Sequence, residues 1–138
     1  MRVRLNISKE KQQALEELGV GVLFLFGSRA QDIAKANSDY DIGLLMTDSD
    51  LIKKGNQELY QAIFEILSEV IGELVNIDIV FLDRASLQLC YHVVKHGKVI
   101  FETNPNMRVK FFERVIREHA DFEEYRKLFE ETTLKRIA

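Results

Sequence analysis

The sequence of 138 residues lacks the features that mark membrane or secreted chains. It holds one cysteine, Cys90, which excludes an internal disulfide and which we interpret as a small core residue of a helix. No apolar run approaches the roughly 18 residues that a membrane-spanning helix requires. The first residues, MRVRLNISKEK, are charged and lack the apolar core of a signal peptide. These absences predict a cytoplasmic chain without a membrane segment.

An excess of basic residues is also missing. The chain carries 19 lysines and arginines against 22 aspartates and glutamates, a formal net charge of −3. Proteins that grip a long nucleic acid usually present a basic face, so we do not expect a nucleic acid partner. Hydrophobic residues make up 46% and charged residues 30% of the chain. This balance predicts one globular domain over residues 1–138, with residues 105–138 as a C-terminal helical extension.

The stretch VGVLFLFGSRAQDIAKANSDYDIGLLM, residues 20–46, organises the rest of the chain. Its first seven residues are almost all apolar and predict a strand that is buried on both faces. Gly27 then permits backbone angles that a side chain would resist. Ser28 stands where the N-cap of a helix beginning at Arg29 belongs. A hydroxyl beside the free N–H groups of a helix start predicts a phosphate-binding turn.

Two aspartates open the second predicted strand. Asp39 and Asp41 flank Tyr40, and residues two apart in a strand point to the same face. Both carboxylates are therefore expected to aim at one spot, as a pair of Mg²⁺ ions requires.

A third carboxylate, Asp78, lies in the middle of the third predicted strand, residues 75–82. Burying it alone would cost several kcal/mol, so it needs a partner, a metal or open water. It is either a third member of the same site or an aspartate near a frayed strand end. Asp83, at the end of this strand, competes with it, although a turn or cap role suits Asp83 better.

The other elements complete an alternating α/β pattern. His92 and His96 are four residues apart, but a third ligand with zinc-like spacing is missing, so we interpret them as solvated residues of a helix end. The further predicted elements are a helix over 8–18 capped by Ser8 and closed by Gly19, a helix from Asp48 or Asp50 to Ile71, a helix over 84–96, a strand over 98–102 and a helix over 107–129.

The last helix has a wide, aromatic-rich apolar stripe. Two interpretations stay open: the helix packs on its own sheet, or part of the stripe forms a partner or dimer surface. The tail beyond residue 134 is expected to fray. The stripe consists of Phe111, Phe112, Val115, Ile116, His119, Phe122, Tyr125 and Phe129.

The pattern Gly27-Ser28, ten residues, Asp39-x-Asp41 resembles the signature of the DNA polymerase β-like nucleotidyltransferase superfamily. Within it, the chain looks like the minimal nucleotidyltransferases, the MntA-type antitoxins that are paired with HEPN-domain toxins. The resemblance implies an α/β (α+β) nucleotidyltransferase fold, with a mixed sheet of about four strands packed by helices and a long C-terminal amphipathic helix. It implies a Mg²⁺-dependent transfer of a nucleoside monophosphate, with ATP or another nucleoside triphosphate as the donor.

The resemblance also assigns residues to roles. It implies that Asp39, Asp41 and Asp78 are catalytic and hold two Mg²⁺ ions, and that Asp78 helps to deprotonate the incoming hydroxyl. Gly27, Ser28 and Arg29 would bind the triphosphate, although an Arg29 that is solvated or paired with Asp32 fits equally well.

The chain departs from these families in its loop. Asp32 stands where many relatives have glycine, Gln31 where a basic residue is usual, and Tyr40 where an aliphatic residue is favoured. None of these changes removes a metal ligand, so they bear on rate and loop geometry.

The short chain leaves no room for a lobe that holds an acceptor, so we expect another protein to bring it. The related antitoxins transfer AMP to a tyrosine of their HEPN toxin, which makes such a toxin the expected partner. A homo- or hetero-oligomer through the C-terminal helix is also expected. Two alternatives stay open: an antitoxin that acts by contact and uses its nucleotide site as a sensor, or a dimeric enzyme that modifies a small molecule, as aminoglycoside nucleotidyltransferases do.

Overall fold

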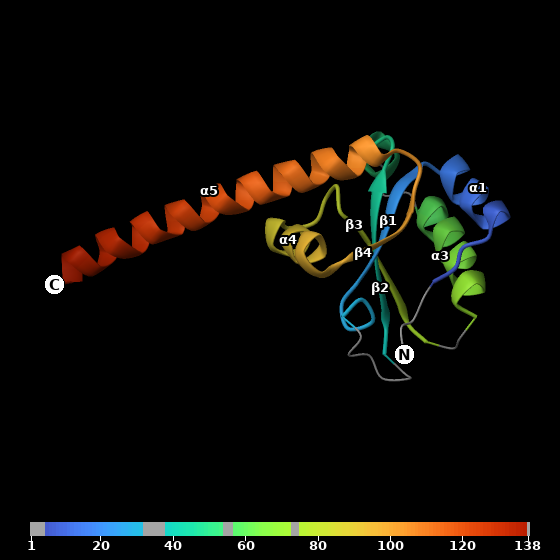
Figure 1. The fold of residues 1–138 in the computed structure, drawn as a ribbon, viewed down its shortest axis with the longest axis horizontal. Helices are drawn as coiled ribbons and strands as arrows, with labels where there is room; N and C mark the ends of the chain where they lie inside the picture. Colours follow the sequence, from blue (N-terminus) through green and yellow to red (C-terminus); the bar gives the residue numbers. More distant parts are fainter. Residues whose placement is uncertain (1–4, 32–37, 54–56, 73–74, 138) are drawn as a thin grey trace.

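The computed structural model describes residues 5–31, 38–53, 57–72 and 75–137, and its centre is a mixed four-stranded sheet (Figure 1). The strands lie in the order β3-β2-β1-β4. The two central strands are antiparallel to each other, β4 is antiparallel to β1, and β3 is parallel to β2. The bounds are β1 Val20–Phe26, β2 Tyr40–Met46, β3 Ile77–Phe81 and β4 Lys98–Glu102. This sheet confirms the predicted fold class.

Helices cover both faces of the sheet. Helices α1 (Lys9–Glu17) and α3 (Gln57–Ile71) pack on one face, where Leu15, Ile63 and Leu67 join the core. Helices α4 (Leu87–His96) and α5 (Pro105–Ile137) pack on the other. Every residue of β1 is buried, as its apolar run predicted.

Three helix boundaries test the sequence predictions. The hydroxyl of Ser8 accepts a hydrogen bond from the Lys11 N–H and caps α1, as predicted. Within the single helix expected up to Ile71, the structure gives α2 (Asp50–Lys53) and α3, and residues 54–56 between them lie outside the described residues. Helix α4 begins three residues later than expected, because the Ser86 hydroxyl accepts from the Leu89 N–H and sets the cap there.

Helix α5 is longer than the sequence predicted and extends beyond the sheet (Figure 1). It begins at Pro105, a residue suited to the first helical position, and continues to Ile137, so the predicted fraying from residue 134 is wrong for the described backbone. Its first turns pack on the domain, with Phe111 and Val115 buried. Among the described residues, neither this helix nor any other is apolar enough over its length to cross a membrane.

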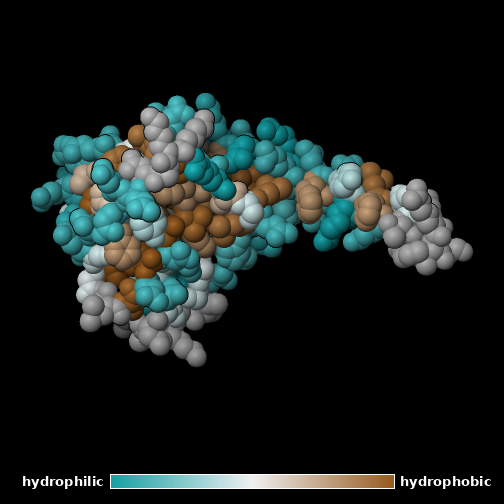
Figure 2. Space-filling model, turned by 180° about the vertical axis from the view of Figure 1, so that it is seen from behind, coloured by the Kyte–Doolittle hydropathy of each residue, from teal (hydrophilic) through white to brown (hydrophobic). Residues whose placement is uncertain are grey.

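Further along α5, the apolar side chains are exposed rather than packed against the domain. The ring of His119 stacks on Tyr91 of α4, with ring centroids 3.5 Å apart, near the point where the helix leaves the domain. Apolar residues then surface along the protruding part (Figure 2). We call Phe122, Tyr125, Leu128 and Phe129, which are 45–68% exposed, the distal α5 surface. The stripe is therefore divided, since its first part belongs to the core and its second part does not.

Candidate active site

Two of the three predicted carboxylates, those of Asp41 and Asp78, lie side by side where β2 and β3 begin, at the lower end of the sheet in Figure 1. Asp41 and Asp78 are register partners in the parallel pair, so their side chains leave the same face. That face is the one covered by α4 and α5, since Leu45 and Leu82, which alternate with these aspartates, lie in the core on that side. Asp39 immediately precedes β2 and is exposed. The structure thus pairs Asp41 with Asp78 and places Asp39 just before β2, two residues from Asp41 in the chain.

The carboxylates repel one another. The pKa of Asp41 is raised above its ordinary value of 3.8, first by burial and then by the negative charges of Asp78 and Asp39. Asp39 and Asp78 are exposed, so Asp41 carries most of the desolvation. The negative charges of Asp78 and Asp39 therefore both act on Asp41.

The turn after β1 lies against this group. Gly27 has φ +74°, in the left-handed region that favours glycine. A Cβ atom on Gly27 would also lie 2.2 Å from Oδ2 of Asp41, closer than real atoms approach. Ser28 follows and is half-buried. Residues 28–31 form a turn, so the helix predicted to begin at Arg29 is absent from these described residues, and Ser28 does not cap one there.

Arg29 is buried, with 5% of its surface exposed. Its Nε and Nη2 atoms donate hydrogen bonds to the backbone oxygen of Ser38, at 3.1 and 2.8 Å. Its guanidinium lies 3.9 Å from the centre of the Tyr40 ring. Asp32, the other partner considered for Arg29, lies outside the described residues. The contacts of Arg29 therefore reach the chain that leads into Asp39.

Asp83 is separated from the carboxylate group. Its Oδ2 accepts a hydrogen bond of 3.1 Å from the backbone N–H of Met46, at the far end of β2 from Asp41. Burial raises the pKa of Asp83, and hydrogen bonds from the backbone N–H groups of Met46 and Asp83 itself oppose that rise. Asp83 therefore ties the end of β3 to β2, and Asp78 is the aspartate placed beside Asp41.

His92 is the residue that sequence reasoning missed. Its ring lies edge-on to Phe26, with centroids 6.3 Å apart, and Phe26 is the register partner of Asp41. The side chain is half-buried rather than solvated, and its positive charge lowers the pKa of Asp41. His96 is exposed, as expected. In the sequence, His92 stands near Cys90 and Val93, which are buried, and this suggests a partly buried side chain. That pattern does not show which strand the side chain meets.

The carboxylates of Asp39, Asp41 and Asp78 offer the oxygen ligands that a hard divalent cation prefers. Aspartate oxygens are the ligands that Mg²⁺ prefers, and a cation would relieve the repulsion that raises the pKa of Asp41. In the part of the chain that the structure describes, no three histidine, cysteine, aspartate or glutamate side chains already converge on a metal position. The fit therefore rests on the chemistry and the shared face of Asp39, Asp41 and Asp78.

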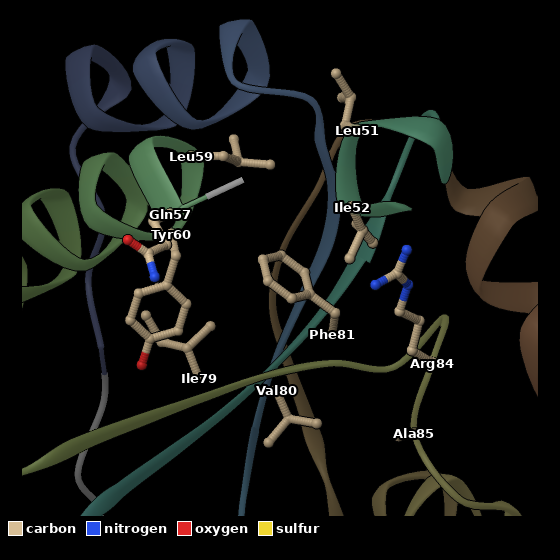
Figure 3. Close-up of a pocket in the computed structure, with 10 residues that line it drawn as sticks. All are labelled: Leu51, Ile52, Gln57, Leu59, Tyr60, Ile79, Val80, Phe81, Arg84 and Ala85. Carbon is tan, nitrogen blue, oxygen red and sulfur yellow. The ribbon is translucent and has the colours of Figure 1, made fainter. Parts of the chain in front are cut away.

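A cavity of about 480 Å³ lies at the opposite end of β3 (Figure 3). Tyr60 of α3 and Phe81 of β3 line it, and Arg84 lies at its edge near Ile52. Asp78 is not among its lining residues, because it stands at the start of the same strand. The cavity is therefore separate from the carboxylate site.

A family model described as polymerase β nucleotidyltransferase matches residues 9–106, and the chain belongs to this family. It is a nucleotidyltransferase, and the match spans the Gly27 turn and all three carboxylates. Two relatives are both named protein adenylyltransferase MntA. The one from Aphanizomenon flos-aquae is 32% identical over 84% of this chain and 77% of the relative. The one from Shewanella oneidensis is 35% identical over 59% of this chain, which spans 54% of that relative's length.

Solved structures support the same assignment. A toxin–antitoxin crystal structure with AMP-PNP matches 92% of this chain and 99% of the solved chain, with a TM-score of 0.65 and 26% identity. A variant of the toxin–antitoxin pair MntA–HpeT matches 94% and 99%, with a TM-score of 0.63 and 25% identity. The likeness extends over almost the whole of the solved chains, which confirms the fold predicted from the resemblance.

Proposed function

We propose that this chain transfers AMP from ATP to a hydroxyl group of a HEPN-domain toxin and acts as the antitoxin of that pair. The observation that carries the proposal is the in-register pairing of Asp41 with Asp78 beside the Gly27 turn. It combines a carboxylate cluster with a turn suited to phosphate. The relatives named protein adenylyltransferase support AMP as the transferred group and a protein as the acceptor.

Each part of the site has a role in this proposal. The Ser28 hydroxyl and the backbone N–H groups after Gly27 bind the β- and γ-phosphates. The hydroxyl oxygen of the acceptor attacks the α-phosphorus of ATP, and Asp78 accepts the proton that this hydroxyl loses. The bond between the α-phosphorus and the oxygen that bridges it to the β-phosphorus breaks, which releases pyrophosphate. Asp39, Asp41 and Asp78 are the residues that would hold Mg²⁺, which neutralises charge on the triphosphate when bound.

The distal α5 surface supports a protein as the acceptor. Phe122, Tyr125 and Phe129 lie at spacings of three and four residues, so they share one side of the helix. Tyr125 is 68% exposed although it continues the side on which Phe111 and Val115 are buried. Aromatic side chains are the commonest anchors of protein interfaces. We propose that the toxin packs on this surface and so brings its hydroxyl to the site.

Labelled ATP tests the proposal. We expect α-labelled ATP and Mg²⁺ to label a purified HEPN-domain partner, and γ-labelled ATP to leave it unlabelled, because AMP is transferred and pyrophosphate leaves. The variant that combines Asp39→Asn with Asp41→Asn is the negative control. Inhibition of the toxin without any label would overturn the enzymatic proposal in favour of an antitoxin that acts by contact.

A further inference from the structure

We propose that Arg29 and Tyr40 form a clamp that fixes Asp39 and Asp41 in position for AMP transfer, so that Arg29 is a positioning residue and not a phosphate ligand. The Arg29–Tyr40 clamp consists of these two side chains and the Ser38 backbone oxygen. The inference deepens the proposed function and rests on it. It assigns a role to the charged side chain that is buried beside the site.

The contacts of the clamp are short and directional. Two nitrogens of one guanidinium donate to one carbonyl oxygen, that of Ser38, at 3.1 and 2.8 Å. The same guanidinium lies over the ring of Tyr40, which is 3% exposed. Taking a guanidinium out of water is costly unless its donors are satisfied, so a buried arginine constrains the groups around it. Here those groups are the two residues on either side of Asp39.

The clamp lies on the opposite face of the sheet from the Asp41 and Asp78 carboxylates. Tyr40 belongs to the core on the α1 and α3 face of the sheet, whereas Asp41 points to the α4 face, because neighbouring residues of a strand alternate. The guanidinium stacks on Tyr40 and is therefore directed away from the face on which the carboxylates stand. This placement suits a side chain that holds the backbone better than one that contacts the triphosphate.

Tyr40 also links the clamp to β3. Its backbone N–H donates to the carbonyl oxygen of Asn76 at 2.9 Å, two residues before Asp78. One residue thus receives the guanidinium on its ring and binds the neighbouring strand through its backbone. A loosened clamp would free Asp39 and Asp41 together and weaken their alignment with Asp78.

The residue types matter for this role. Arginine offers a planar fork that donates twice to one acceptor and stacks on an aromatic face, whereas lysine offers a compact ammonium on a flexible stem. Tyrosine provides the ring face, and an aliphatic side chain does not. Arg29→Lys keeps the charge and removes the clamp, and Tyr40→Leu removes the ring while it keeps apolar bulk. Tyr40→Phe keeps the ring and is the matched control.

The test measures metal affinity and kinetics in the full chain. Mn²⁺ binding is followed by the electron paramagnetic resonance signal of the free ion, without nucleotide or acceptor. Residues that orient metal ligands typically alter metal affinity by about 10–100-fold when they are replaced. We expect Arg29→Lys and Tyr40→Leu each to weaken Mn²⁺ binding by about tenfold or more, and the double variant to lose little beyond either one. Arg29→Lys and Tyr40→Leu should each lower kcat and leave KM for ATP near the wild-type value. Tyr40→Phe should retain Mn²⁺ affinity.

A phosphate ligand would behave differently. Arg29→Lys would then raise KM for ATP and leave Mn²⁺ binding unchanged, and Tyr40→Leu would have no effect on either, which would overturn the clamp. Backbone amide exchange at Tyr40 provides a readout that needs neither metal nor activity, and we expect Arg29→Lys to accelerate it. If the wild-type chain binds Mn²⁺ but labels no partner, the proposed function fails, and the Mn²⁺ affinities and amide exchange of the variants still decide whether Arg29 and Tyr40 position the carboxylates. Unchanged amide exchange in Arg29→Lys refutes the clamp whatever the activity.

Discussion

A methyl group on Gly27 would collide with the carboxylate oxygen Oδ2 of Asp41, so a side chain at residue 27 requires the Asp41 carboxylate to shift. Gly27 is also at φ +74°, where alanine is strained. The contact is specific to the site, because it involves the central carboxylate of the three. It links the backbone of the turn after β1 to the position of the Asp41 carboxylate.

We therefore expect Gly27→Ala to displace the Asp41 carboxylate and to reduce AMP transfer strongly. Gly72→Ala is the matched control, because Gly72 has a similar φ of +67° but its added Cβ would have only one neighbour, at 4.0 Å. Both variants should lose about 1 kcal/mol of unfolding free energy or somewhat more, because alanine is strained at positive φ. Denaturant melts and transfer assays on the two variants separate strain from displacement. Equal activity in both would mean that Asp41 tolerates the displacement.

The charge of Asp41 lowers the stability of the metal-free protein near neutral pH. Because its pKa is raised on folding, the folded state still holds a proton at pH values where the unfolded state has released it. The contribution of Asp41 to stability is therefore greatest below the ordinary value of 3.8 and is lost as pH rises through the raised pKa. We expect Asp41→Asn to melt at an equal or higher temperature than the wild type at pH 7 in a chelator, with the difference shrinking at acid pH. Calorimetric melts across this range are the measurement, and a lower melting temperature at pH 7 contradicts the repulsion.

The same charge is expected to be needed for the metal. Asp39→Asn and Asp41→Asn should each weaken the binding of Mg²⁺ with ATP, because both remove a hard oxygen ligand. Titration calorimetry measures this directly. If the double variant binds Mg²⁺ and ATP as tightly as the wild type, the metal assignment is wrong.

Asp78 and Asp83 stand near opposite ends of β3 and are expected to respond differently. Asp78→Asn should reduce AMP transfer by about 10²–10⁴-fold, the usual effect of losing a general base, and should largely preserve nucleotide binding. Asp83→Asn should leave transfer near the wild-type rate, because Asp83 accepts from the Met46 N–H and is remote from the reacting groups. Single-turnover rates with saturating ATP distinguish them. If Asp78→Asn transfers AMP at the wild-type rate, another group is the general base.

The distal α5 surface is expected to hold the toxin. Changing Phe122 and Tyr125 together to serine should abolish co-purification with the HEPN-domain partner, because such anchors each contribute about 2 kcal/mol or more to binding. Val109→Ser is the control, since Val109 is an exposed apolar residue nearer the start of the same helix. Nucleotide binding and helix content should be unchanged in both. Loss of folding in the double variant would place these side chains in the domain's own core.

The sequence predicted the strands better than the contacts between them. β1 and β4 were predicted with the bounds that the structure gives, because both are short runs bounded by glycine or polar residues. The shared face predicted for Asp39 and Asp41 assumed that both lie in one strand, and β2 begins at Tyr40, so Asp39 lies just outside it. The pairing of Asp41 with Asp78 did not follow from the period of a strand, because the pattern within one strand does not fix its register against a strand far away in the chain.

Two side chains were misjudged for a related reason. Arg29 was expected to bind phosphate, to be solvated or to pair with Asp32, and the solvated alternative is wrong, because Arg29 is buried and its guanidinium lies over the Tyr40 ring. His92 was expected in solvent, and it lies beside Phe26, because α4 crosses the end of β1. In both cases the side chain contacts a residue from another part of the chain, Tyr40 for Arg29 and Phe26 for His92, which a local sequence pattern does not predict.

The parallel register of β2 and β3 has a consequence for how the protein matures. Sliding β3 by one residue would turn Asp78 to the α1 and α3 face and place an isoleucine beside Asp41. Parallel pairing requires a crossover through α2 and α3, so Asp41 and Asp78 are brought together by a contact between distant parts of the chain. The two carboxylates therefore have no common location until β2 and β3 have paired. A newly synthesised copy completes this part of the site only when that pairing is made.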